Sequence, residues 1–108
     1  MTGPTPPGPD RSPPAITTFP GRDTTVDSVG VFTIEVIAHD RNEIDTLALL
    51  VSGAGFAFPT DTVHDTVADV SYAISLGALR HQPFSFRVAA GDVLGHDTLT
   101  DSVNVRLK

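Results

Sequence analysis

The sequence contains no cysteine and no tryptophan, and it has only one lysine and two glutamates among its charged residues. Without cysteine, a disulfide framework, a thiolate metal site and a cysteine nucleophile are all excluded. The strong helix formers Lys and Glu are scarce, whereas Val, Thr, Gly, Pro and Asp are frequent. This composition favours strands and turns over helices, so the sequence predicts an all-β fold.

Long apolar runs and clusters of positive charge are also missing. No apolar run approaches the ~18 residues that a membrane-spanning helix needs, and no signal peptide is recognised after Met1. The formal net charge is −6, and the few arginines are scattered along the chain. These features argue against binding to nucleic acid or insertion into a membrane, and they leave divalent cations as compatible partners.

Prolines are concentrated at the start of the chain. Residues 1–14 hold Pro4, Pro6, Pro7, Pro9, Pro13 and Pro14, out of nine prolines in all. Proline favours extended polyproline geometry, which is typical of a stalk or linker, although a tail with no spacing role would have the same composition. We therefore divide the 108 residues into a Pro-rich linker, 1–14, and one domain, 15–108.

From residue 15 onward, apolar residues alternate with polar ones in short runs that turn residues separate. This period of two predicts seven strands, at 15–19, 31–39, 46–53, 56–58, 69–76, 84–90 and 101–107, with a turn over Asp40–Glu43. Tyr72 is assigned to the core, and His39 points outward. The residues expected to be buried together are Phe32, Ile34, Val36, Leu47, Leu49, Phe84, Phe86 and Val88.

The order of these strands carries a resemblance. Two strands end in the same pattern, apolar-x-Ala-x-Asp, at Val36 to Asp40 and at Val88 to Asp92, and a Val-x-Val-x-Leu strand closes the chain. Over roughly Pro14 to Lys108 this order resembles the bacterial immunoglobulin-like modules of cell-surface proteins and, more loosely, their cadherin and fibronectin type III relatives. The resemblance implies a seven-stranded immunoglobulin-like Greek-key sandwich.

In that topology the loops after Asp40 and Asp92 emerge at the same end of the domain. One interpretation is structural, because Asp at a strand end accepts hydrogen bonds from loop amides. The other is a calcium site in which Asp40, Glu43, Asp92 and Asp97 converge, with Asp65 from a third loop, since Ca²⁺ prefers several oxygen ligands.

Histidines offer a further alternative at the same end. His39 and His96 could join these acids in a transition-metal site, although two histidines in separate loops are more often solvated surface residues. A catalytic triad is not indicated, because Ser52, His64 and Asp65 lack the arrangement that such a triad requires. No phosphate loop or dinucleotide motif occurs. The sequence therefore predicts neither catalytic residues nor an organic cofactor.

Asp-Thr and Asp-Ser dipeptides recur along the chain. With the apolar residue that often follows, they resemble the acceptor motif of a general O-glycosylation system of secreted bacterial proteins. A turn followed by a strand also generates this pattern. Asp favours the turn, Thr begins the strand, and an apolar residue follows because polar and apolar residues alternate in the strand. The dipeptides start at Asp23, Asp27, Asp45, Asp61, Asp65, Asp97 and Asp101.

Together these features predict a non-catalytic structural or adhesive spacer module of a larger extracellular bacterial protein. Its expected partners are neighbouring domains of the same chain in a tandem array, and a cell-surface protein or glycan. The alternative is a calcium-dependent or ligand-binding accessory domain of a secreted enzyme. A catalytic domain in the flanking chain would distinguish the two.

Overall fold

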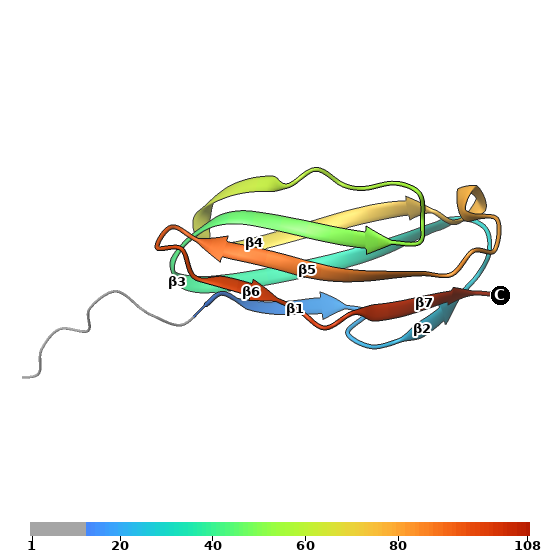
Figure 1. Ribbon diagram of the computed structural model, residues 1–108, viewed down its shortest axis with the longest axis horizontal. Coiled ribbons are helices and arrows are strands. Elements are labelled where there is room, and N and C mark those ends of the chain that lie inside the picture. Colours follow the sequence, from blue (N-terminus) through green and yellow to red (C-terminus); the bar gives the residue numbers. More distant parts are fainter. Residues whose placement is uncertain (1–12) are drawn as a thin grey trace, which may run out of the picture.

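The computed structural model describes residues 13–108, so most of the predicted linker lies outside the described residues. These residues form seven strands and one short 3-10 turn (Figure 1). The elements are β1 (Ala15–Phe19), β2 (Thr24–Val26), β3 (Val31–Ser52), β4 (Asp61–Ser75), η1 (Leu76–Leu79), β5 (Phe84–Asp92), β6 (Asp97–Leu99) and β7 (Val103–Leu107).

All seven strands belong to one curled, mixed sheet. Its order is β1-β3-β5-β7-β2, with β4 paired to β3 and β6 paired to β5. The β2–β7 pair is parallel, and the other pairs in the described part of the chain are antiparallel. The predicted all-β class is confirmed. The immunoglobulin-like Greek-key arrangement stays a prediction.

The curl originates in β3, which folds back on itself (Figure 1). Its first half pairs with β1 and with the second half of β4, whereas its second half pairs with β5 and, at its start, with the first residues of β4. The register with β4 shifts between His39 and Ile44, which is where the ribbon reverses. The sequence predicted a turn at this point, over Asp40–Glu43. The backbone there is strand-like throughout, so the reversal occurs inside one continuous strand.

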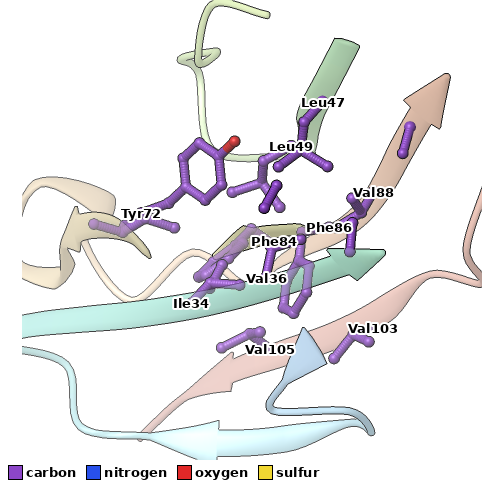
Figure 2. Packing of buried hydrophobic residues seen from close by; sticks show 14 of the residues in the cluster. Ile34, Val36, Leu47, Leu49, Tyr72, Phe84, Phe86, Val88, Val103 and Val105 are labelled. Atoms are coloured by element: carbon purple, nitrogen blue, oxygen red, sulfur yellow. The ribbon is translucent and has the colours of Figure 1, made fainter. Parts of the chain in front are cut away.

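The core lies between the facing halves of this curled sheet (Figure 2). Side chains from both halves of β3 meet those of β4, β5 and β7, as period-two alternation predicts. Seven of the eight expected core residues are buried, namely Ile34, Val36, Leu47, Leu49, Phe84, Phe86 and Val88. Phe32 packs at the margin, where its ring meets that of Phe84 at a centroid distance of 6.3 Å. Tyr72 is also buried, as predicted.

The predicted strand over residues 56–58 is wrong. Gly53 and Gly55 adopt positive φ angles of 89° and 78°, which turn the chain away from a ladder before the segment begins. The aromatic rings of the segment are used differently. Phe58 packs edge-on against Tyr72 at a centroid distance of 5.1 Å, so the segment covers the core with side chains rather than with backbone hydrogen bonds.

The short strands β2 and β6 were not predicted, and β4 begins eight residues earlier than expected. β2 and β6 have three residues each, too few to display alternation. Pro14, assigned to the linker, is fully buried, and the hydroxyl of Thr98 in β6 donates a hydrogen bond to the carbonyl oxygen of Pro14 at 2.6 Å. Packing of the folded domain therefore begins at Pro14.

Replacing Phe86 with Ala should lower the free energy of unfolding by about 3 to 5 kcal/mol, because it removes a fully buried ring from a packed core. Chemical denaturation measures the change. The matched control is Leu50→Ala in β3, which removes a side chain that is 44% exposed and should have a much smaller effect. Equal losses for the two variants would contradict the proposed core.

Candidate functional site: the buried aspartates

Two aspartates are the buried charged residues of the described chain. Asp40 is 7% exposed and Asp92 is 4% exposed. Each follows, two residues on, a buried alanine, Ala38 or Ala90, so each lies at the end of a core-facing row. The register places Asp92 opposite Ile44, just after the reversal of β3. The two acids expected at one end of the domain therefore lie close together.

Asp92 organises the connection between β5 and β6. Its Oδ1 accepts hydrogen bonds from the backbone N–H groups of Leu94 and His96, both at 2.9 Å. Its Oδ2 lies 2.9 Å from Nδ1 of His96 and accepts a long hydrogen bond, 3.5 Å, from the side-chain amide of Asn42. The backbone of Asp92 also pairs with that of His96, at 2.9 Å. This one carboxylate thus satisfies two backbone amides of a tight turn, and the amides of Asp92, Val93 and Gly95 bond to backbone carbonyls.

Asp40 also accepts a hydrogen bond from the backbone of a nearby residue, at the reversal of β3. Its Oδ1 accepts a hydrogen bond from the backbone N–H of Asn42 at 3.1 Å. Its Oδ2 is buried and has no hydrogen-bond partner among the described residues. Asn42 bridges the two acids, because its backbone binds Asp40 while its side chain reaches Asp92. A buried carboxylate oxygen without a hydrogen-bond partner costs free energy. The hydrogen bond to the turn therefore does not by itself account for the burial of Asp40.

The hydrogen bonds control the ionisation of Asp92. Burial by itself would raise the pKa of this carboxyl group. The backbone and side chain of His96, the backbone of Leu94 and the side chain of Asp40 outweigh burial and lower the pKa of Asp92 from 3.8 to about 2. The side chain therefore stays ionised down to strongly acidic pH.

The other proposed ligands form no metal-binding group with this pair in the described chain. The side chain of Glu43 is exposed, and its carbonyl oxygen accepts a hydrogen bond from Val93 at 2.9 Å. Asp97 is exposed and lies over Gly91, where an added Cβ would come within 2.7 Å of the Asp97 Oδ1. Asp65 accepts a hydrogen bond from the backbone of its neighbour Thr66 at 2.7 Å. In the described part of the chain, no group of three or more His, Asp or Glu side chains is placed to hold a metal ion.

The two histidines differ from each other. His39 is exposed at the end of the first half of β3, as predicted. His96 is only partly exposed, and its ring contacts the Asp92 carboxylate at 2.9 Å. The spacing of two residues from Asp40 to Asn42 and from Asp92 to Leu94 is the signal for the two turns. No sequence signal indicated the contact between Asn42 and Asp92, because it joins residues 50 positions apart.

No helix among the described residues is long and apolar enough to cross a membrane. Comparisons with family models, with curated proteins and with solved structures return no match. The function must therefore be argued from the geometry and from the strand pattern.

The low pKa of Asp92 predicts a specific acid sensitivity. A carboxyl group whose pKa is depressed in the folded state adds stability above its unfolded pKa, near 3.8, and this contribution is lost as the pH falls toward 2. Asp92→Asn should therefore have a lower melting temperature than the wild type at pH 5 to 7, and the difference should shrink between pH 4 and pH 2.

Thermal melts across this pH range test the expectation. The control Asp101→Asn removes an exposed acid and shows how much of the pH dependence comes from net charge alone. A difference between wild type and Asp92→Asn that stays constant from pH 6 to pH 2 would count against the assigned role of Asp92.

Proposed function

We propose that the chain is an immunoglobulin-like Greek-key sandwich that serves as a non-catalytic structural or adhesive spacer in a larger extracellular bacterial protein. Its partners in this proposal are neighbouring domains of the same chain, and a cell-surface protein or glycan. The bacterial, extracellular setting follows from the resemblance of the strand pattern to bacterial immunoglobulin-like modules. The mechanical part of the proposal follows from the topology.

The observation that carries the proposal is the placement of the terminal strands. β1 begins toward one end of the long axis, and the chain ends at the opposite end beside β2 (Figure 1). β2 and β7 pair in parallel over Thr24–Val26 and Val105–Leu107, and the N–H of Lys108 extends this pairing with a hydrogen bond to the Val26 carbonyl at 2.9 Å. A module of this shape transmits force along its length.

The parallel pair determines how such force is borne. Tension on the end of the chain pulls β7 along its parallel partner β2, so their interstrand hydrogen bonds are loaded together, whereas tension on the start of the chain enters through β1. Two strands pulled apart at one end instead lose their hydrogen bonds one after another. At the other end of the domain, the buried Pro14 and its hydrogen bond from Thr98 attach the start of the chain firmly to β6. Both attachments suit a spacer under tension.

Single-molecule pulling in two directions tests this proposal on one protein. The sequence has no cysteine, so introduced cysteines give unique handles. Handles at the two termini load β2 and β7 in shear. Handles from Val31→Cys and Ser75→Cys, which are paired across β3 and β4, separate that pair from its end. We expect a clearly higher unfolding force for the terminal handles. Equal forces in the two directions would refute the load-bearing role.

One observation favours the second candidate, a calcium-dependent or ligand-binding accessory domain of a secreted enzyme. The buried Oδ2 of Asp40 lacks a partner in the described chain and lies at the end where Asp92, Glu43 and Asp97 were expected to converge. A bound cation would supply the missing partner. Against this candidate, Glu43 and Asp97 are exposed and form no metal-binding group with Asp40 in the described chain.

Thermal shift with calcium and with magnesium separates the two candidates. We expect no calcium-specific rise in melting temperature, because Asp40 and Asp92 act as turn acceptors. A calcium site of millimolar affinity would instead add about 1.4 kcal/mol at roughly ten times that concentration, which is several degrees for a domain of this size. The control is the double variant Asp40→Asn/Asp92→Asn. A saturable shift with calcium alone, absent from the double variant, would establish the second candidate.

A further inference from the structure

Exposed apolar side chains lie at both ends of the long axis. At the first end, the β5–β6 connection carries Val93 and Leu94, which are 49% and 48% exposed. This connection lies beside the reversal of β3 (Figure 1). At the opposite end, the β2–β3 connection carries Val29, 71% exposed, and leads into Val31, 68% exposed. Each end thus presents an exposed apolar pair that a partner surface could cover.

The first pair is held rigidly. The carboxylate of Asp92 binds the Leu94 amide, and the amide of Val93 donates to the carbonyl of Glu43 at 2.9 Å. The N–H of Gly95 closes the turn on the Asp92 carbonyl at 3.1 Å. Little conformational entropy remains to be lost when such a turn meets a partner, which favours binding.

The charge around this first end is mainly negative, and we call it the acidic end. Glu43 and Asp45 follow the reversal of β3, Asp65 pairs with the start of its second half, and Asp97 pairs with the end of β5. The exposed Arg41 opposes them. An approaching surface would therefore experience a net negative field around an apolar tip.

The opposite end carries two cations, Arg80 and Lys108, against one carboxylate, Asp27, and we call it the basic end. Arg80 is exposed in the connection from η1 to β5, and Lys108 lies beside it, because the His81 ring contacts the Lys108 carbonyl at 2.9 Å. Asp27 offsets part of this charge through an exposed contact of 3.6 Å with Lys108. The N–H of Leu76 binds the carbonyl of Gly30 at 2.8 Å, so Val29 is joined to the same surface.

We propose that copies of this chain associate head to tail, with the acidic end of one copy docked on the basic end of the next. The apolar pairs Val93–Leu94 and Val29–Val31 would form the centre of the contact, and the opposite charges would surround it and fix its polarity. The two surfaces are different, so the contact does not close on itself and extends copies into an open row. An end surface of one small domain is below the standard interface size, so the association is weak and depends on concentration.

The test uses the full chain and two exposed double variants that leave the core untouched. The acidic-end variant is Val93→Ser/Leu94→Ser, and the basic-end variant is Val29→Ser/Arg80→Glu. Sedimentation equilibrium at concentrations up to about 1 mM, the range for weak association, gives the average mass. We expect the wild-type mass to rise steadily with concentration beyond that of a dimer, and each variant alone to remain monomeric with an unchanged circular-dichroism spectrum.

The decisive measurement is sedimentation equilibrium of an equimolar mixture of the two variants. Each retains one intact end, so the mixture should form a one-to-one dimer and grow no further. The matched control Leu50→Ser removes an exposed apolar side chain from the middle of β3 and should associate like the wild type. A monomeric wild type, a mixture that fails to dimerise, or a control that loses association as fully as the end variants would each overturn the proposal.

Discussion

The reversal inside β3 is the constraint on which the rest of the structure depends. A strand that turns back on itself without leaving the extended conformation brings its own two halves into opposition, and the core forms between them. Polar backbone groups at such a point are partly withdrawn from water and must find partners. The side chain of Asp40 accepts a hydrogen bond from the backbone N–H of Asn42, and the side chain of Asn42 links the reversal to Asp92 on the neighbouring turn. Two chain reversals are thus stabilised by one shared polar network.

This arrangement explains why charged residues are tolerated beside a well-packed core. Asp92 loses hydration on burial, and amide hydrogens from its own turn replace the lost water. The carboxylate remains ionised because its hydrogen-bond donors favour the charged form. Asp40 has fewer hydrogen-bond donors around it, and its buried Oδ2 has no hydrogen-bond partner in the described chain. The asymmetry between the two acids, rather than their number, distinguishes this end of the molecule.

The limits of prediction from the sequence follow from the range of the interactions involved. Alternation at Ile34, Val36, Phe86 and Val88 identified buried residues correctly, because the direction of a side chain in a strand depends on its immediate neighbours. The position of Asp92 at the end of a strand was readable for the same reason, whereas Asp40, also expected at a strand end, lies inside β3.

The errors have the opposite cause. β2 exists because β7 lies beside it, and its own three residues carry no such signal. Residues 56–58 alternate well enough for a strand, yet the preceding glycines direct them across the core instead. Of the four acids grouped as ligands, Glu43 and Asp97 are exposed and join no metal-binding group in the described chain, which depends on the conformation of each turn rather than on sequence spacing.

Tyr72 gives the molecule an unusual optical property. It is the single tyrosine in a chain without tryptophan, so near-ultraviolet absorbance and intrinsic emission above the weak phenylalanine background come from one known ring. That ring contacts Phe58, and its hydroxyl donates a hydrogen bond to Asp61 at 2.8 Å. Burial, aided by the hydrogen bond to Asp61, raises the pKa of the Tyr72 phenol. In the folded protein this phenol therefore ionises at a higher pH than a free tyrosine does. The absorbance and fluorescence of Tyr72 therefore report whether the segment between β3 and β4 is packed against the core. The protein thus carries an intrinsic probe for the detachment of that segment.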